Sequence, residues 1–138
     1  MRQLQNWQEQ VSTKSACTNY RLFKTDLKLE NYLCHLKVAD RISLSKFRCA
    51  SQKLPAFESR ITQGTTPDVC KLCDSAEAGD EFHYILNCKS FISERKSLIN
   101  KYYYTRPNVI KFQKLFQTKS IKDLSNLAKF TNVILSKL

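Results

Sequence analysis

The chain has 138 residues, the length of one ordinary domain and short for two. Apolar residues make up 42% of it, with only 2 Gly and 3 Pro, which argues against a disordered tail and favours a helix-rich fold. Its formal net charge is +11, from 23 Lys and Arg against 12 Asp and Glu, so RNA or DNA is a natural partner, with a merely soluble basic surface as the alternative.

The first ten residues contain no apolar core of an export signal, and no stretch approaches the roughly 18 apolar residues of a membrane span. We therefore expect no membrane association and an intracellular location, in the nucleus or cytoplasm. Six cysteines could form three disulfides in a secreted protein. In a reducing compartment they are expected to bind metal or stay free.

Three helices are predicted in the first fifty residues. Residues 1–26 are polar and mixed and predict only a weak helix. Its possible anchors are Trp7, Val11, Tyr20, Leu22 and Phe23. From residue 27 to 50 apolar positions recur near helical spacing, which predicts two helices separated around residues 37–40. Asp40 would cap the second of these, with Lys46 and Arg48 on or near its solvent side.

The middle of the chain loses this periodicity. Residues 51–69 hold two prolines and a glycine among polar residues, so we expect an irregular or short extended connector. Residues 80–87 then place Phe82, Ile85 and Leu86 on one apolar face of a short helix.

Three more helices are predicted in the last third of the chain. Residues 91–104 favour one helix that ends at Arg106-Pro107, because proline disfavours helix in its predecessor, and Pro107 can open the next one. The last begins at Ser120, with Asp123 three residues on as in a capping box. Their apolar positions are, in order, Phe91, Ile92, Leu98, Ile99 and Tyr102; Val109, Ile110, Phe112, Leu115 and Phe116; and Ile121, Leu124, Leu127, Ala128, Ile134, Leu135 and Leu138.

Four potential metal ligands lie close together in the sequence: Cys70, Cys73, His83 and Cys88. Zinc favours tetrahedral coordination by thiolates and imidazole, and a Cys-x-x-Cys turn lets two sulfurs reach one ion. On a continuous α-helix, His83 and Cys88 would diverge by about 140°, because each residue turns about 100°. We therefore expect the helix to break immediately before Cys88, so that all four residues can bind Zn²⁺.

The donor set predicts a structural site without catalysis. Three thiolates and one imidazole fill a tetrahedral shell, whereas a catalytic zinc keeps a position open for water or substrate. Four ordinary buried residues, or a redox-active Cys-x-x-Cys pair, are the alternatives, although no thioredoxin-like pattern surrounds the pair. Cys17, Cys34 and Cys49 are expected to be buried thiols. Cys34-His35 could be half of a second site, but no nearby pair at ligand spacing completes it.

Basic residues flank the predicted zinc site and are candidates to contact phosphate, because the metal would fix their backbone. They are Arg60, Lys71, Lys89, Arg95 and Lys96. A solvated basic face is the alternative for all five.

Aromatic and basic residues are also interleaved farther along the chain, between Lys101 and Arg106. Exposed tyrosines beside cations can stack on unpaired bases while the cations hold phosphate. The alternative is that Tyr102 and Tyr103 pack inward with Leu98 and Ile99.

Three segments carry a resemblance to a known family. They are residues 54–60 (LPAFESR), 70–73 (CKLC) and 79–88 (GDEFHYILNC). Together they resemble the zinc-binding tail at the carboxyl end of non-LTR (LINE-type) retrotransposon reverse transcriptases. The resemblance continues through Glu94-Arg95, Tyr102-Tyr103 and Arg106-Pro107-Asn108 to Lys111-Phe112, and covers roughly residues 40–117. At Ser59 the chain departs from the family pattern, which usually has glycine before the arginine.

The resemblance implies zinc held by the four predicted ligands and binding of element RNA or target DNA during target-primed reverse transcription. The parent reverse transcriptase, or another protein, is an implied partner. The chain has no Tyr-x-Asp-Asp motif, no carboxylate set for two-metal polymerisation and no endonuclease constellation. We therefore expect a truncated copy, or a fragment of a longer gene, without the polymerase, in which Met1 was an internal methionine of a longer frame.

These observations predict a mostly α fold: a small helical domain built around a Cys-Cys-His-Cys zinc knuckle, with at most a short β-hairpin. Within one domain, residues 1–50 would form a helical segment, 51–90 the connector and knuckle, and 91–138 the C-terminal helices. The predicted function is a non-catalytic, zinc-stabilised nucleic-acid-binding accessory domain with no small-molecule substrate. A protein-interaction or scaffolding module with purely structural zinc is the alternative. No nucleophile, base and oxyanion arrangement indicates an enzyme.

Overall fold

The computed structural model describes residues 2–13, 19–24, 30–49, 53–63 and 68–138. Within these ranges the chain is helical, and its β structure is a single antiparallel bridge between Val69 and Ala78. The elements are α1 (Arg2–Thr13), α2 (Tyr20–Phe23), α3 (Asn31–His35), α4 (Val38–Arg48), α5 (Pro55–Ile61), the π-helix η2 (His83–Asn87), the 3₁₀ turn η3 (Lys89–Phe91), α6 (Ile92–Leu98), α7 (Lys101–Tyr104), α8 (Val109–Phe116) and α9 (Ile121–Lys137). The predicted mostly α fold with at most a short β-hairpin is confirmed.

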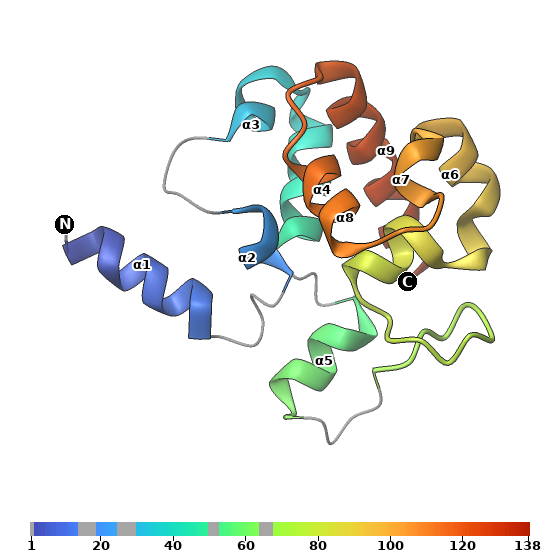
Figure 1. The fold of residues 1–138 in the computed structure, drawn as a ribbon, viewed down its shortest axis with the longest axis horizontal. Coiled ribbons are helices and arrows are strands. Elements are labelled where there is room, and N and C mark those ends of the chain that lie inside the picture. Colours follow the sequence, from blue (N-terminus) through green and yellow to red (C-terminus); the bar gives the residue numbers. More distant parts are fainter. Residues whose placement is uncertain (1, 14–18, 25–29, 50–52, 64–67) are drawn as a thin grey trace.

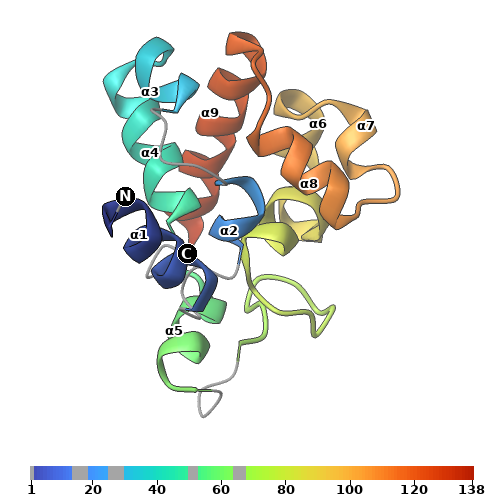
Figure 2. The same cartoon turned by 60° about the vertical axis from the view of Figure 1, so that its left-hand side comes forward.

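The core forms around α9. This helix packs along α4, and α3, α6 and η2 contact it as well; Figures 1 and 2 both show α4 and α9 side by side. The buried side chains include Leu44 and Phe47 of α4 and Leu127, Phe130 and Ile134 of α9. Burial of each such side chain stabilises the fold by roughly 1.5–3 kcal/mol. None of the described helices is both long and apolar enough to cross a lipid bilayer.

The loop of residues 68–80 and helix α5 lie together below this helical core in Figures 1 and 2. Helix α5 occupies part of the segment expected to be irregular, so the prediction for residues 51–69 is wrong over Pro55–Ile61. Proline suits the first helical position, since the N–H that it lacks has no partner within a helix. Seven residues are too few to show a helical period in the sequence. Residues 64–67 of this connector lie outside the described residues.

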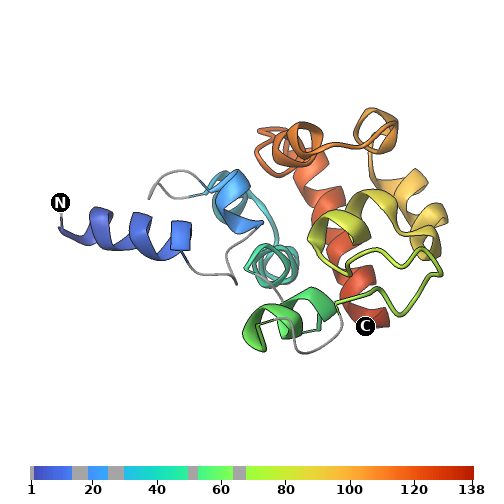
Figure 3. The same cartoon turned by 60° about the horizontal axis from the view of Figure 1, so that its bottom comes forward.

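The N-terminal segment holds two helices where one weak helix was predicted. Helix α1 contacts α2, and α2 contacts α8. Of the predicted anchors, Tyr20 and Leu22 pack against the core and Trp7 is half-buried. The side chains of Val11 and Phe23 lie outside the described set. Figure 3 shows α1 projecting from the rest of the molecule.

Helix α4 differs from its prediction at both ends. Its N-cap is Lys37, so Asp40 does not cap the helix. Asp40 lies in the first turn, where a negative charge interacts favourably with the helix dipole. Lys46 is exposed as predicted. Arg48, expected on or near the solvent side, is 2% exposed, forms an ion pair with Glu30 (3.1 Å) and lies 4.9 Å from the centroid of the Tyr32 ring.

Residues 91–104 form two helices, where one was predicted. Helix α6 ends at Leu98, and Ile99 is extended (φ −114°, ψ 135°). The side chain of Asn100 accepts a hydrogen bond from the backbone N–H of Tyr102 (2.9 Å) and caps α7. Asparagine thereby offers the backbone an alternative to a continuous helix. Ile92 and Tyr102 are 45% and 50% exposed, although both were predicted to face inward.

The last two helices begin at side-chain caps. Ser120 accepts a hydrogen bond from the backbone N–H of Asp123 (3.3 Å), which confirms the predicted start of α9. Asn108 accepts one from the backbone N–H of Lys111 (2.8 Å) and caps α8. Helix α8 therefore begins at Val109, two residues after the proline that was expected to open it.

Gly79 lies where the loop, α5 and η2 meet. A Cβ atom there would lie 2.8 Å from Cγ of Pro55 and 2.8 Å from the hydroxyl oxygen of Tyr84. Both neighbours are buried and cannot easily yield. We expect Gly79→Ala to lower the free energy of unfolding by about 1–3 kcal/mol, as overpacking does, measured by urea denaturation. An unchanged unfolding midpoint would show that α5 moves aside at no cost; Ala78→Gly, at an exposed neighbour, is the control.

Candidate metal centre

The four predicted ligands converge. Cys70 and Cys73 come from the loop, His83 is the first residue of η2, and Cys88 follows its last residue. Their ligand atoms all lie within 4.8 Å of one another. Sγ of Cys70 is 3.9 Å from Sγ of Cys88, and Sγ of Cys73 is 3.4 Å from Nε2 of His83. Cys70, Cys73, His83 and Cys88 could therefore hold a metal ion between them.

Backbone hydrogen bonds close the loop that carries the first two cysteines. The N–H of Cys70 donates to the carbonyl of Glu77 (2.9 Å), and that of Gly79 donates to the carbonyl of Asp68 (2.6 Å). Within the Cys-x-x-Cys turn, the N–H of Leu72 donates to Sγ of Cys70 (3.3 Å). Such N–H···S bonds stabilise a thiolate, and the turn aims both sulfurs to the same side.

The π-helix η2 solves the geometric problem posed by the other two ligands. The N–H of Cys88 donates to the carbonyl of His83 (2.7 Å), which is an i to i+5 bond. A turn closed at that spacing brings residues five apart back toward the same side of the helix. The helix then stops, because Cys88 is extended (φ −60°, ψ 125°). The predicted break before Cys88 is confirmed. The π turn that precedes this break also helps to bring His83 and Cys88 to the same side.

A second set of side chains fixes the imidazole. Nδ1 of His83 lies 3.0 Å from Oε2 of Glu77, which leaves Nε2 facing the sulfurs. Carboxylates commonly orient metal-binding histidines in this way. Asn87 donates to the same Glu77 oxygen (3.2 Å), and Asp80 accepts from the backbone N–H of His83 (2.9 Å). Sequence analysis missed Glu77 and Asp80; the only signal was Asp80 three residues before His83, a helix-start spacing.

The thiols of Cys73 and Cys88 have different pKa values, because hydrogen bonding lowers the first and burial raises the second. The Ser75 hydroxyl, 3.1 Å from Sγ of Cys73, is the main cause that lowers the pKa of this thiol to about 6. Burial raises the pKa of the Cys88 thiol to about 11. At neutral pH the first is therefore mostly thiolate while the second keeps its proton. Metal binding must displace the proton of Cys88, and positive charge at the centre supplies the driving force.

Arg95, expected to contact phosphate, has a structural position. Its side chain is 4% exposed. Nε donates to the carbonyl of Ile85 (2.7 Å) and an Nη atom donates to the carbonyl of Tyr84 (3.0 Å). Both carbonyls belong to η2, whose abrupt end leaves them without helical partners. Arg95 therefore holds the π turn that carries His83, and this burial removes it from the surface available to a nucleic acid.

Arg60 is likewise occupied inside the protein. Its guanidinium forms an ion pair with Glu81 (3.2 Å), and the two side chains are 12% and 0% exposed. Burial raises the pKa of Glu81, and Arg60 opposes that rise. The pair ties α5 to the turn just before η2. Ser59, where the family pattern has glycine, is within α5 and needs no positive φ angle, so serine fits there.

The three predicted lysines are exposed, unlike the two arginines. Lys71 lies between the first two cysteines, Lys89 directly follows Cys88, and Lys96 is on α6. Of the five residues predicted to contact phosphate, these three remain accessible.

The other cysteines lie apart from this centre. The side chains of Cys34 and Cys49 are exposed, so the expectation that they are buried is wrong. Cys34 is on the solvent side of α3, whose inner side is taken by Tyr32 and Leu36. His35 beside it is exposed too, and among the described residues the pair joins no metal-binding group. Cys17 lies outside the described residues.

The tyrosine-rich segment is only partly buried. Tyr103 packs against the core, whereas Tyr102 is 50% exposed. Their rings meet edge to face with centroids 5.2 Å apart, and Nζ of Lys111 lies 4.8 Å from the centroid of Tyr102. One face of Tyr102 therefore already has a cationic partner from α8.

No protein-family model matches the chain, and comparisons with curated proteins and with solved structures also give no match.

Proposed function

We propose that the ion is Zn²⁺ and that its role is structural. Three sulfurs and one imidazole nitrogen are the donors that zinc prefers. Bonds of about 2.3 Å to sulfur require tetrahedral edges of roughly 3.8 Å, and somewhat shorter edges to nitrogen. The Cys70–Cys88 and Cys73–His83 separations, 3.9 and 3.4 Å, match these edges, and all ligand atoms lie within 4.8 Å of one another, so a closing movement of about 1 Å would complete the tetrahedron. Four protein donors fill a tetrahedral shell, so we infer no catalytic role.

We further propose that the zinc-stabilised domain binds single-stranded RNA or DNA as an accessory module of the non-LTR retrotransposon type. The observation that carries this proposal is that Lys71 and Lys89 are both exposed and each directly follows a cysteine of the four-residue cluster in the sequence. The net charge of +11 supports it, since phosphate neutralisation dominates nucleic-acid affinity. The resemblance of residues 54–60, 70–73 and 79–88 to reverse-transcriptase tails supports the same class of partner.

Protein binding is a second candidate, favoured by one observation. Val109 and Ile110 begin α8 and are 53% and 62% exposed, and α7, which contacts α8, carries the 50% exposed side chain of Tyr102. Apolar side chains gathered at an exposed helix start can pack against another protein. In this case the lysines would only maintain solubility.

Salt dependence of binding tests the proposed function. We expect the zinc-loaded chain to bind a fluorescein-labelled single strand, with affinity falling about twentyfold between 50 and 200 mM salt if Lys71, Lys89 and Lys96 each neutralise one phosphate. Changing these three to alanine should flatten the slope. The matched control changes Lys119, Lys122 and Lys129, also exposed, to alanine. Absence of binding, or equal slopes for both triple variants, would contradict the proposed lysine contacts.

A further inference from the structure

A cavity of about 350 Å³ lies beside the metal centre. Its walls come from three parts of the chain: the segment that leads into α5, the Cys-x-x-Cys turn with the neighbouring Tyr84, and the end of α9. Its volume is at the lower end of the roughly 300–1,000 Å³ of small-ligand sites. The space is thus suited to a group of about the size of one nucleotide and too small for a duplex.

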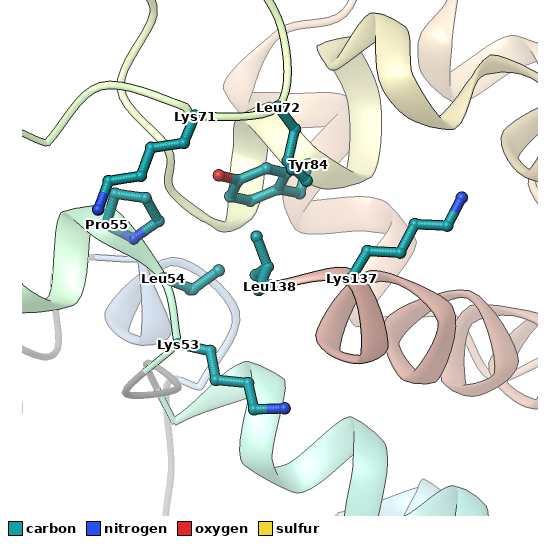
Figure 4. Close-up of a pocket in the computed structure, with 8 residues that line it drawn as sticks. All are labelled: Lys53, Leu54, Pro55, Lys71, Leu72, Tyr84, Lys137 and Leu138. Carbon is teal, nitrogen blue, oxygen red and sulfur yellow. The ribbon is translucent and has the colours of Figure 1, made fainter.

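The lining combines an apolar centre with a cationic border. Leu54 and Tyr84 are buried and form the base, while Leu72 is partly exposed beside them. Figure 4 shows the side chains of Lys53, Lys71 and Lys137 around this centre, with their ammonium groups toward the periphery. None of the lining side chains is acidic. Its charge and polarity therefore complement a flat, weakly polar group attached to anions.

The three lysines are not equivalent. Nζ of Lys137 pairs with Glu94 (3.1 Å), and Nζ of Lys53 donates to the carbonyl of Leu135 (3.0 Å). Lys71 is exposed, and none of the ion pairs among the described residues includes it. Its charge is the least compensated of the three, so Lys71 should contribute most to binding an anion.

The metal centre positions one wall of the cavity. Lys71 and Leu72 are the two residues between Cys70 and Cys73, and the carbonyl of Leu72 accepts a hydrogen bond from the Ser90 hydroxyl. Metal ligation on both sides leaves these two residues little freedom. A wall fixed in advance lowers the entropic cost of binding a flexible strand.

We propose that this cavity receives one unstacked base of a single-stranded nucleic acid, while Lys71, assisted by Lys53 and Lys137, holds the adjoining phosphates. This inference rests on the proposed function and adds to it a specific site. Apolar contact with a base edge and face tolerates any base, and the Tyr84 hydroxyl is the only uncharged polar side-chain group of the lining. We therefore expect little sequence preference.

Two charge reversals test the phosphate contact. Lys71→Glu and Lys122→Glu change the net charge equally, but Lys122 is at the other end of α9, about 22 Å along the helix from Lys137. With the zinc-loaded chain and an oligothymidylate of about twelve nucleotides, Lys71→Glu should weaken binding about tenfold or more and Lys122→Glu less than about threefold. Equal losses would overturn the cavity site and leave general electrostatic binding intact.

An abasic strand of the same length tests the base. It carries the same phosphates, so it should bind the wild-type chain about tenfold more weakly than the oligothymidylate. Leu72→Trp, which fills the cavity and keeps every charge, should weaken oligothymidylate binding to the abasic level. Unchanged abasic binding by this variant would show that it remains folded; if it loses zinc, Lys71→Glu alone decides.

Three results would overturn the inference. Equal affinity for abasic and thymidylate strands would show that no base enters the cavity. Lys71-dependent binding of a polyglutamate peptide, as tight as that of the oligothymidylate, would assign the cavity to an acidic protein segment. Failure of the wild-type chain to bind any strand would overturn the proposed function as well.

Discussion

Replacing Cys88 with serine should abolish metal binding and unfold much of the domain. Structural zinc supplies on the order of 10 kcal/mol of apparent free energy at neutral pH, which equals or exceeds the total stability of many small domains. Cys88 is 0% exposed and belongs to the same buried cluster as Tyr84 and Phe91, so the effect should spread beyond the loop. Elemental analysis should fall from one zinc per chain to none, and the thermal unfolding transition should broaden or disappear.

Cys34→Ser provides the matched control. It makes the same chemical change at an exposed thiol on α3, outside the metal-binding group. This variant should keep one zinc per chain and the wild-type unfolding temperature. A Cys88→Ser protein that retained both zinc and its unfolding temperature would contradict the four-ligand centre. Addition of a strong chelator to the wild type should reproduce the loss.

The second large effect is expected at Arg95. Arg95→Met keeps much of the side-chain volume but leaves the carbonyls of Tyr84 and Ile85 buried without their donor. The substitution removes two hydrogen bonds from a charged group and leaves both carbonyl acceptors unsatisfied. We expect this loss to lower the free energy of unfolding by about 3–5 kcal/mol. Zinc affinity should fall too, because these carbonyls belong to the turn that carries His83. Urea denaturation and competition with a chromophoric chelator measure the two effects.

Lys96→Met is the control for this substitution. It removes one positive charge from the next residue, which is exposed on α6, and should change stability by less than about 0.5 kcal/mol. Both variants lose one charge, so general electrostatics affect them alike. If Arg95→Met were as stable as Lys96→Met yet bound RNA more weakly, Arg95 would contact phosphate after all and its buried hydrogen bonds would matter little.

The metal centre could be predicted because its evidence is local. Thiol and imidazole side chains at a Cys-x-x-Cys spacing restrict both the ion and its geometry, and the angle between His83 and Cys88 on a helix demanded a break. The structure has that break at Asn87. The π turn before it was not predictable, since no residue type encodes an i to i+5 bond. The role of Glu77 was not predicted for a related reason, because its side chain contacts His83 only when the loop is folded.

Buried cations were the main failure of the sequence interpretation. Arg48, Arg60 and Arg95 were each assigned to solvent or phosphate, because arginine is rarely buried unless it is paired. Their partners are a carboxylate or carbonyls far away in the sequence, such as Glu81 for Arg60. Contacts of this kind cannot be predicted from the spacing of residues in the sequence. The three lysines predicted to contact phosphate, Lys71, Lys89 and Lys96, are at the surface, as the cost of burying an ammonium group predicts.

Some helix boundaries were predicted correctly and others were missed. Ser120 was predicted to start α9 because a cap and a long apolar stripe coincide there. Asn100 was overlooked because apolar residues continue on both sides of it, although its side chain caps α7 and divides the segment. Side-chain caps thus outweighed apolar periodicity where the two disagreed.

The π turn also limits how the length of this segment can vary. Such a turn is equivalent to an α-helical turn that has gained one residue. Deletion of a single residue between His83 and Cys88 would turn the π turn into an ordinary α-helical turn, in which the two ligands are four residues apart and diverge by only about 40° around the axis. A related chain that keeps this centre should therefore have either four residues in that interval with a π turn, or three residues with an α-helical turn.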